Sequence, residues 1–544
     1  MLIRFLFFLI PAALMGQMLD PSLLLKPPTN AWPTYNGDYT GRRFSPLTQI
    51  NQSTIKRLNL AWVFRVRPGD TPGTVVGGVA PPELAKEFEH SRSNYVIKAT
   101  PLMVNGILYF TTPDNTFAVD AHSGRQLWHY YWRSTGGIHI GNRGVGMYGN
   151  WLFFETPDNY VVSVEARTGK ERWHRKIADV REEYFSTAAP LVVGDHVLLG
   201  TGGDSLDVPG FLEARDPETG KIQWRWWTEP LKKGDPGSDT WPDMGSMRHG
   251  GGMTWIPGTY DPETQTYFLG TGNPNPVMTG ASRKGDDLFT CTIVALDINT
   301  GKLKWYYQVS PHDAHDYDAV QTPVLIDGTW DGKPRKLLAQ ASRNGYFFLL
   351  DRTTGKDLVS RPYISSLNWS KGTNAKGQPI PNLKKDATPD GVLVSPASGG
   401  GTNWPPPTYD PQTGLFYVSS AKTFAEFYLT DTSKHPEGYG GVDRGVANLE
   451  NALRAIDYHT GKTAWKHVWP QGQDSGLLST AGKLLFSGDG ADHLVALDPA
   501  NGHILWHAGL GQNVSNGPMT YMLNGKQYLI VGAGDSLYAF TLGD

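Results

Sequence analysis

Apolar and polar positions alternate in short blocks along the chain, and one phrase recurs seven times. Each copy has an apolar strand running into an acidic residue, a turn with Ser, Thr or Asn before Gly, and a second strand. The copies span 118–128, 164–173, 214–224, 295–305, 350–359, 455–465 and 496–506. Short alternating segments with this punctuation predict β-hairpins and not long helices.

The turn residues explain why each copy should fold back on itself. The acidic side chain and the residue before Gly supply turn hydrogen bonds, and Gly takes the positive-φ position. Trp ends every copy except the fifth, where Val359 stands. We expect the Trp ring to pack on a neighbouring copy. One hairpin cannot bury its own apolar face, so the copies must stack. Repeats of this kind predict a β-propeller.

The number of copies indicates how the ring would close. Residues 58–62, ending in Trp62, look like an eighth closing strand without its own hairpin. We expect its partners around 528–540, which would pair the two chain ends and leave no exposed sheet edge. The prediction is therefore an all-β, eight-bladed β-propeller closed by pairing of N- and C-terminal strands, with residues 17–544 as one domain. Length alone would suggest three or four domains.

Composition agrees with a large strand-and-turn domain. Gly and Pro make up about 19% of the chain, against a usual share of about 12%. The formal net charge of −3 argues against a nucleic-acid-binding protein, which would carry a basic surface. Four long stretches look irregular, at about 65–95, 228–250, 361–403 and 423–450, and loops of this length are usually functional or disordered.

The N-terminus predicts export. Arg4 precedes an apolar run of about ten residues and then small residues before Gln17, which is the pattern of a secretory signal peptide over 1–16. No later stretch is long and apolar enough to cross a bilayer. We therefore expect a periplasmic or secreted protein.

Cys291 is the single cysteine, so these 544 residues contain no disulfide, CxxC zinc site or CxxCH haem motif. It lies in an apolar segment, where a lone cysteine usually acts as a small buried hydrophobe.

Several short phrases, taken in order, carry a family resemblance. They are Trp32-Pro-Thr-Tyr-Asn-Gly37, Ala99-Thr-Pro-Leu102, Gly141-Asn-Arg-Gly144, Leu269-Gly-Thr-Gly-Asn-Pro274, Pro311-His-Asp-Ala-His-Asp-Tyr-Asp318, Ser342-Arg-Asn-Gly345 and Gly400-Gly-Thr-Asn-Trp404. With the repeats, they resemble the quinoprotein alcohol dehydrogenases of the methanol and ethanol dehydrogenase type. The resemblance covers nearly all of the mature chain and implies pyrroloquinoline quinone (PQQ) and a metal ion in an eight-bladed propeller.

The segment 312–318 holds two histidines and three aspartates. From the residues alone it is open whether this is a solvated turn, a transition-metal site or a catalytic carboxylate. The resemblance implies that Asp316 is the general base that takes the alcohol proton. It also implies that Arg343 hydrogen-bonds the quinone oxygen near C5 and stabilises charge developing there.

The resemblance also implies a metal site at Asn273, Asp316 and Asp318. In an extended segment residues two apart face the same side, so both carboxylates should reach one ion. The family's glutamate ligand falls at Ser205, beside Asp204. Two carboxylates suit Ca²⁺, whereas a third from Asp204 would suit a lanthanide, so both metals remain open.

The cofactor contacts follow from the same resemblance. Trp255 would form the floor under the planar quinone, although core packing is an alternative role in a chain with 18 tryptophans. PQQ carries three carboxylates, so at least one arginine should bind it. The residues expected to bind PQQ are Arg143, Thr187, Gly202, Gly203, Trp255, Arg343 and Asn403.

The chain departs from the family pattern around cofactor and substrate. Gly137 and Ile138 stand where many members have a vicinal cysteine pair, and Lys98 stands where many have a glutamate that contacts the quinone. Lys98 would pair with a PQQ carboxylate or be solvated. Asp474 takes the place of a tryptophan lining the substrate cavity. A more polar cavity suggests a polyol or another hydroxylated substrate.

Two functions from different classes follow. The first is an exported PQQ-dependent dehydrogenase that oxidises an alcohol and passes electrons to a separate acceptor, cytochrome c or a quinone-linked carrier. The alternative is a non-catalytic propeller acting as a binding or assembly scaffold in the cell envelope. The ordered set Asn273, Asp316 and Arg343 discriminates between them, because a scaffold has no use for it.

Overall fold

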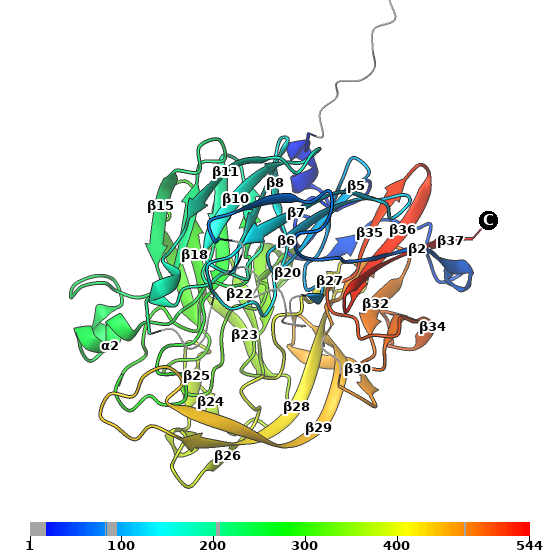
Figure 1. Cartoon of the computed structure of the whole chain (residues 1–544). Helices are drawn as coiled ribbons and strands as arrows, with labels where there is room; N and C mark the ends of the chain where they lie inside the picture. Colours follow the sequence, from blue (N-terminus) through cyan, green and yellow to red (C-terminus); the bar gives the residue numbers. More distant parts are fainter. Residues whose placement is uncertain (1–17, 82, 84–94, 203–206, 473–474, 544) are drawn as a thin grey trace, which may run out of the picture.

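The computed structural model of the chain describes residues 18–81, 83, 95–202, 207–472 and 475–543, and strands dominate it (Figure 1). The segment expected to be a signal peptide, 1–16, lies outside the described residues. The helices with described bounds are short: η1 Pro21–Leu25, η2 Ile55–Arg57, η4 Val180–Glu182, η5 Ser238–Thr240, α2 Met244–His249 and η6 Leu383–Lys385. This nearly all-β content agrees with the prediction.

Eight sheets of four or five strands, and one of two strands, are formed by the described residues. The sheets of the first half comprise β3 Val75–Gly78, β4 Leu102–Val104, β5 Ile107–Thr112, β6 Asn115–Asp120 and β7 Gln126–Arg133; β8 Gly146–Tyr148, β9 Trp151–Glu155, β10 Tyr160–Glu165 and β11 Glu171–Lys176; β12 Leu191–Val193, β13 His196–Leu199, β14 Phe211–Arg215 and β15 Ile222–Trp227; and β16 Thr259–Asp261, β17 Thr266–Gly270, β18 Thr292–Asp297 and β19 Leu303–Gln308.

The sheets of the second half comprise β20 Val324–Trp330, β21 Lys333–Ala341, β22 Tyr346–Asp351 and β23 Asp357–Pro362; β24 Ser370–Thr373 and β25 Pro379–Pro381; β26 Val392–Val394, β27 Thr408–Asp410, β28 Leu415–Leu429, β29 Gly441–Asp457 and β30 Lys462–Trp469; β1 Phe44–Ser45, β31 Leu478–Thr480, β32 Leu484–Gly488, β33 His493–Leu497 and β34 Ile504–Gly509; and β2 Leu58–Arg65, β35 Met519–Leu523, β36 Lys526–Ala533 and β37 Ser536–Leu542.

The seven repeated phrases are hairpins, as predicted. In each copy a register shift falls just before the turn, for example between Ala118 and Val119 and between Ala295 and Leu296. The turn carboxylate accepts local hydrogen bonds: Asp120 Oδ1 accepts from the backbone N–H and hydroxyl of Ser123 at 2.8 and 2.7 Å. These bonds hold the pKa of Asp120 below its ordinary value, although burial opposes them.

The closing side chain of each repeat except the last packs on the turn glycine of the next, which confirms the expected docking. A Cβ added at Gly124, Gly169, Gly220, Gly301, Gly355 or Gly502 would lie within 3 Å of the Trp ring from the preceding copy or from β2. Trp224 Nε1 also donates to the carbonyl of Ile298 at 2.8 Å. Val359 takes the place of Trp against Gly461. Sequence-adjacent sheets are thereby joined in series.

This docking gives a stability prediction. Gly301 has φ +66°, and a Cβ there would lie 2.5 Å from Cε3 of Trp224. We expect Gly301→Ala to lower the free energy of unfolding by about 1–3 kcal/mol, since alanine is strained at positive φ and must also displace the ring. Gly332→Ala is the matched control, because Gly332 has φ +73° and open space around it. Urea denaturation measures the free energy of unfolding of both variants. An equal decrease in Gly301→Ala and Gly332→Ala would contradict the docking role.

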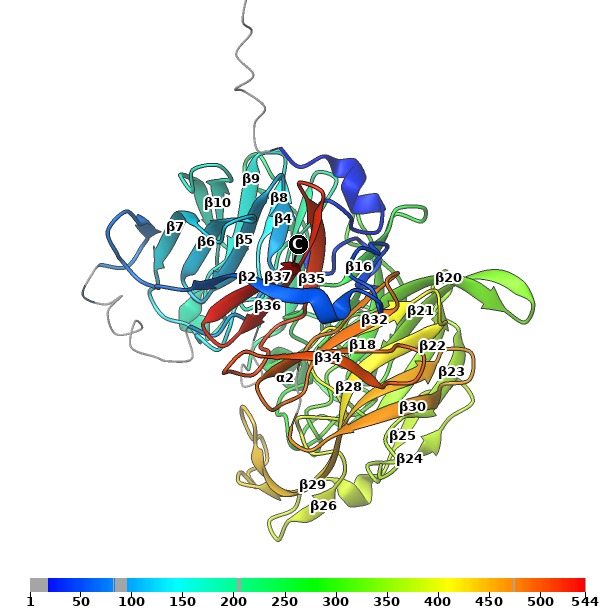
Figure 2. The same ribbon diagram turned by 90° about the vertical axis from the view of Figure 1, so that its right-hand side faces the viewer.

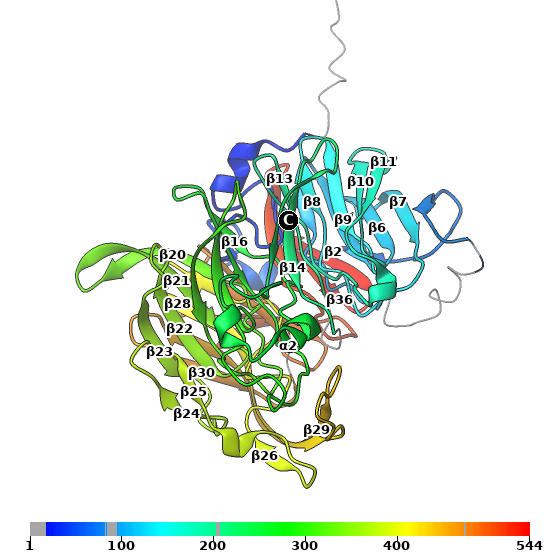
Figure 3. The ribbon, with the colours of Figure 1, turned by 90° about the vertical axis from the view of Figure 1, so that its left-hand side faces the viewer.

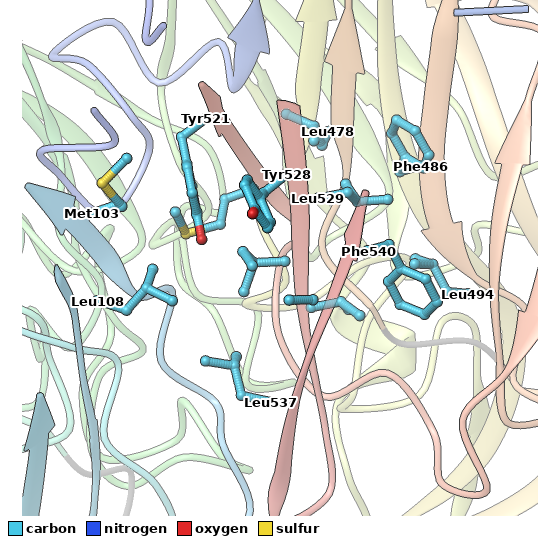
Figure 4. Close-up of a cluster of buried hydrophobic side chains, with 14 of the residues drawn as sticks. Met103, Leu108, Leu478, Phe486, Leu494, Tyr521, Tyr528, Leu529, Leu537 and Phe540 are labelled. Atoms are coloured by element: carbon cyan, nitrogen blue, oxygen red, sulfur yellow. The ribbon is translucent and has the colours of Figure 1, made fainter. Parts of the chain in front are cut away.

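The last strand of the chain pairs with a strand from its N-terminal part. β2 pairs antiparallel with β37, with Leu58 opposite Leu542 and Trp62 opposite Ala539 (Figure 2). Apolar side chains between this sheet and its neighbours form one buried cluster. Figure 4 shows part of it, with Met103 and Leu108 on the left, Tyr528 near the centre, and Phe486, Phe540 and Leu494 on the right.

One stretch expected to be irregular is regular. Residues 423–429 and 441–450 belong to β28 and β29, which pair from Leu415 opposite Asp457 to Leu429 opposite Gly441. The two strands extend away from the other sheets as a long ribbon beside β26 (Figure 1). The expectation of a long loop over 423–450 is therefore wrong for these residues.

The sheets place the candidate residues at one common end. In an antiparallel sheet the start of the first strand and the end of the second lie at the same edge. Arg143 and Thr187 precede β8 and β12, whereas Asn273 and Arg343 follow β17 and β21. The repeat turns lie at the opposite edge. The sheets of β8 and β12 are neighbours, and Figure 3 shows β8 of one beside β13 of the other.

Candidate active site

Arg343 gathers the two aspartates of the segment 312–318. Its Nη2 donates to Asp316 Oδ2 at 2.6 Å, and its Nη1 donates to Asp318 Oδ2 at 2.8 Å. All three side chains are buried, and Asp318 is fully so. A buried guanidinium thus pairs with both carboxylates in charge-assisted hydrogen bonds.

The two carboxylates do not converge by the geometry that the sequence suggested. Asp316 has φ +67°, so the segment is not extended at this residue and simple alternation does not apply. The side chains meet because both reach Arg343. Asp316 and Asp318 therefore lie together at Arg343 by a backbone route that differs from the expected extended segment.

Asp318 joins two further predicted residues to this cluster. Its Oδ2 also accepts from Trp255 Nε1 at 3.2 Å, and its Oδ1 accepts from the backbone N–H of Asn273 at 2.5 Å. Five predicted residues, from the loops before β16, after β17, before β20 and after β21, therefore share one hydrogen-bonded network centred on Asp318.

A glycine run allows the loop of Trp255 to approach Asn273. The backbone N–H of Gly252 donates to the Asn273 carbonyl at 2.7 Å. Gly251 has φ +107°, and a Cβ there would lie 2.3 Å from the same carbonyl oxygen. Only glycine fits this contact without displacing backbone.

Arg343 is fixed by the loop before β27. Its Nε donates to the Ser398 carbonyl at 2.8 Å, and its own carbonyl accepts from Gly401 N–H at 2.8 Å. A Cβ at Gly400 would lie 2.3 Å from Arg343 Cγ. The guanidinium orientation is therefore set before any ligand binds.

A second cation lies over the face of Trp255. The guanidinium carbon of Arg143 is 4.7 Å from the Trp255 ring centroid and 5.3 Å from that of Trp404. Arg143 Nη1 donates to Thr187 Oγ1 at 2.6 Å, so these two predicted cofactor residues lie together. Sequence reasoning did not single out Trp404, although it ends the phrase that contains Asn403.

Lys98 adds another positive charge beside the same ring. Its Nζ donates to the Ile140 carbonyl at 2.7 Å and lies 6.0 Å from the Trp404 centroid. Lys98 and Arg143 thus flank Trp404 and create a region of positive potential, which suits a ligand with several carboxylates.

The remaining predicted cofactor residues have different positions. Gly202 lies against this region: its N–H donates to the Phe185 carbonyl at 2.7 Å, and an added Cβ would be 3.4 Å from Thr187 Oγ1. Asn403 lines a separate cavity. Gly203, Asp204, Ser205 and Asp474 lie outside the described residues.

A buried arginine links two of these loops and escaped the sequence reasoning. Arg283 is fully buried, and its Nη2 donates to the Pro276 carbonyl at 2.9 Å and to the Asp313 carbonyl at 2.5 Å. Its Nη1 pairs with Asp287 at 2.6 Å. It therefore ties the loop after Asn273 to the segment that carries Asp316.

Glu155, at the end of β9, is a buried carboxyl below the Arg143 loop. Its backbone carbonyl accepts from Asn142 Nδ2 at 2.7 Å, and its Oε1 accepts from Gly200 N–H at 3.3 Å. Burial raises its pKa from 4.5 to about 8, although hydrogen bonds from Ser186 and Gly200 oppose the shift.

The raised pKa of Glu155 predicts a pH effect on stability. The folded state binds the proton more tightly, so this contribution is present below the unfolded pKa and is lost as pH rises through about 8. We expect the free energy of unfolding to fall less between pH 5 and pH 8 in Glu155→Gln than in the wild type. Urea denaturation at both values measures this, with exposed Glu182→Gln as the control. Identical pH slopes for Glu155→Gln and the wild type would contradict the prediction.

The metal ligands can be assessed from the donor set. Asp316 and Asp318 supply carboxylate oxygens, and Asn273, whose backbone N–H bonds to Asp318 Oδ1, carries a side-chain amide oxygen. Such hard oxygen donors suit Ca²⁺ or a trivalent ion. Among the described residues no group of three or more His, Cys, Asp or Glu side chains is arranged to hold a metal. The described donors fit a cation only as two carboxylates plus an amide.

Cys291 is buried, as expected. Burial raises the pKa of its thiol well above the ordinary value, so it remains a neutral packing group.

A cavity of about 800 Å³ lies at the end of the sheets opposite the candidate active site. Leu19, Leu24, Met147 and Trp151 are among its lining residues. It contains none of the predicted site residues.

Among the described helices, none has the length and apolar character needed to cross a membrane.

Comparisons with known proteins place the chain in a family. The family model described as glucose/ethanol/alcohol dehydrogenase, beta-propeller domain, matches residues 32–390. A second model, described as outer membrane protein assembly factor BamB, matches residues 450–544.

Related proteins cover most of the chain. Quinoprotein alcohol dehydrogenase PedH of Pseudomonas putida is 33% identical over 91% of this chain and 84% of its own length. Quinoprotein ethanol dehydrogenase of Pseudomonas aeruginosa is 34% identical with the same coverage.

Solved structures agree. The quinohemoprotein alcohol dehydrogenase of Comamonas testosteroni has a TM-score of 0.86 and 29% identity over 97% of this chain and 83% of its own. A europium-containing methanol dehydrogenase has a TM-score of 0.81 and 28% identity over 96% and 99%. The chain therefore belongs to the family of quinoprotein alcohol dehydrogenases, PQQ-dependent β-propeller enzymes that oxidise alcohols.

Proposed function

We propose that the Asp318-centred network is the catalytic centre of this PQQ-dependent alcohol dehydrogenase. The observation that carries the proposal is that Arg343 binds Asp316 and Asp318 while Asp318 binds Trp255 and Asn273. A base, a fixed cation, a flat aromatic ring and an amide beside one another meet the requirements of alcohol oxidation by a bound quinone.

The shape and charge of these residues match those of PQQ. Trp255 offers an aromatic face for a planar ring, and Arg143 and Lys98 supply cations for carboxylates. Thr187, Gly202, Gly203 and Asn403 complete the proposed contacts. When bound, PQQ supplies the two-electron acceptor and the metal ion supplies a Lewis acid at its C5 carbonyl.

The protein residues then have distinct tasks. Asp316 accepts the hydroxyl proton of the alcohol, which requires its carboxylate to lie within hydrogen-bonding distance of that hydroxyl. Arg343 orients the Asp316 carboxylate through their hydrogen bond, and it stabilises negative charge developing nearby. Because Arg343 is held by Ser398 and Gly401, little reorganisation is needed during the reaction.

Asn273, Asp316 and Asp318 are the proposed metal ligands. Two carboxylates with an amide oxygen favour Ca²⁺, and a lanthanide is the alternative if a further carboxylate joins them.

We also propose how the whole chain is organised and where it acts. The eight sheets would be the blades of one propeller domain over 17–544, closed where β2 meets β37. The leader over 1–16 would direct the enzyme to the periplasm or the exterior.

The single cysteine leaves no haem motif in these 544 residues, so electrons would pass to a separate acceptor, for which we propose cytochrome c.

The proposed substrate is an alcohol, with a polyol or another hydroxylated compound as the narrower class. A non-catalytic scaffold is not favoured, because it would not require Asn273, Asp316 and Arg343 to be joined. The match to an assembly factor is confined to the last repeats.

Reconstitution tests the proposal. Purified protein should bind PQQ in the presence of Ca²⁺ or La³⁺ and then reduce a dye at the expense of an alcohol. Assays with each metal and with chelator alone identify the ion. Absence of PQQ binding with either metal would overturn the proposal.

A further inference from the structure

The loop between β7 and β8 carries a buried ion pair that the proposed reaction does not use. His139 Nε2 lies 2.7 Å from Asp114 Oδ2, and both side chains are only 7% exposed. Asp114 belongs to the turn between β5 and β6, so the pair joins the loop to another part of the sheet that contains β7. Ser134, at the start of the loop, donates a further hydrogen bond to Asp114.

The sheet that contains β9 and β10 supports the same loop. Asp158, in the turn between these strands, accepts hydrogen bonds from the backbone N–H and the hydroxyl of Thr135 at 2.8 and 3.1 Å. Gly137 has φ +85° and lies so close to the Pro157 carbonyl that a Cβ would clash with it. The start of the loop is therefore fixed on two sheets, and His139 is the anchored side chain next to Ile140.

Lys98 depends on this loop for its position. Its Nζ donates to the carbonyl of Ile140 at 2.7 Å, one residue after His139. Arg143 has separate support, because its backbone N–H and its Nη1 both donate to Thr187. Loss of the His139 contact should therefore displace the lysine more than the arginine.

We propose that His139 is a positioning residue for the cofactor site: paired with Asp114, it holds the Ile140 carbonyl where that carbonyl directs Lys98 toward a PQQ carboxylate. The inference rests on the proposed function, because it takes PQQ as the ligand of Lys98. His139 would act through Lys98 and not on the reacting atoms. Its effect should therefore appear in the affinity for PQQ rather than in kcat of the loaded enzyme.

The charge on His139 makes this contact depend on pH. Burial lowers the pKa of His139, but the hydrogen bond and charge of Asp114 and the charge of Asp158 outweigh burial and raise the pKa above its ordinary value of 6.5. The ion pair is therefore complete below pH 6.5 and is lost as pH rises through the raised pKa. Asp114 and Asp158 are the described charged groups that act on His139 most strongly, and Lys98 and Arg143 are the cations held at the same loop.

Titration of the protein with PQQ at pH 6 and pH 9, with saturating Ca²⁺, tests the inference through binding. At pH 6, His139→Gln and Asp114→Asn should each bind PQQ about 5- to 30-fold more weakly than the wild type, a typical size for coupling between two contacts. At pH 9 each variant should bind within about twofold of the wild type, because the wild type has then lost the ion pair as well. Asparagine tolerates the φ of +63° at position 114, so Asp114→Asn keeps the turn.

The route through Lys98 has its own test. Lys98→Met should weaken PQQ binding at pH 6, and adding His139→Gln should weaken it less than about twofold further, because both changes remove the same contact. His503→Gln is the matched control, since His503 is exposed in the turn before β34, and it should bind PQQ like the wild type at both pH values. An equal loss of affinity in His139→Gln at pH 6 and pH 9, or full additivity in the double variant, would overturn the inference.

Hydrogen exchange of the PQQ-free protein distinguishes failure of this inference from failure of the proposed function. After correction for the intrinsic rate, amides of residues 134–141 should exchange faster at pH 9 than at pH 6 in the wild type but not in His139→Gln. Equal corrected exchange at the two pH values in the wild type would overturn the inference even if PQQ binds. Absence of PQQ binding by the wild type at both pH values would overturn the proposed function and, with it, the assignment of Lys98 to a PQQ carboxylate.

Discussion

Asp316→Asn should lower kcat for alcohol oxidation about 10²- to 10⁴-fold, the usual contribution of a general base. The amide has nearly the shape of the carboxylate and keeps an oxygen for Arg343, which now contacts Asp316 Oδ2 at 2.6 Å. It cannot, however, take the proton of the alcohol. Dye-linked kcat of reconstituted enzyme measures the effect, and PQQ absorbance should show that the cofactor is still bound.

The control for this variant is Asp239→Asn, an equivalent change at an exposed carboxylate in η5. It should retain full turnover. If Asp316→Asn binds PQQ and metal normally and turns over within tenfold of the wild type, Asp316 is not the base.

Arg343→Met should affect both stability and catalysis. It leaves Asp316 and Asp318 buried without their shared guanidinium, and breaking a buried ion pair in this way typically costs about 3–5 kcal/mol. Loss of a fixed cation near developing charge should also lower kcat about 10²- to 10³-fold. Urea denaturation of metal-free protein measures the first effect, and dye-linked kcat of loaded protein measures the second.

A double variant separates these two consequences. Adding Asp318→Asn to Arg343→Met removes one of the two uncompensated carboxylates, so part of the lost stability should return. Turnover should remain low because the cation is still absent. If the single variant Arg343→Met has the same free energy of unfolding as the wild type, Arg343 does not stabilise the buried carboxylates.

The repeated hairpins were predictable because their interactions are local. An acidic residue, a Ser, Thr or Asn side chain and a glycine within six positions determine each turn, as at Asp120 to Gly124. The docking of Trp224 on Gly301 links adjacent repeats, and its periodicity makes it visible in the sequence.

Other features depend on contacts between distant segments. Arg283 and Glu155 carry no motif, and their importance comes from burial against loops that only the fold brings near. The 423–450 stretch is rich in polar residues and glycine, but pairing of β28 with β29 makes most of it regular. Tertiary pairing outweighs local preference in such a ribbon.

The site itself was only partly predictable. Family motifs identified Asp316, Asp318, Arg343 and Trp255, and the structure brings these four into one network. The stacking of Trp404 on Arg143 was not visible, because nothing in the local sequence indicates which ring a guanidinium will meet.

The most direct test of this site is diffraction from crystals of the protein loaded with PQQ and La³⁺, with the anomalous signal locating the ion. We predict that La³⁺ lies against the side-chain oxygens of Asn273, Asp316 and Asp318, and that the quinone ring lies parallel to Trp255 with carboxylates toward Arg143 and Lys98. An ion remote from Asp316, or a quinone bound away from Trp255, would contradict the account.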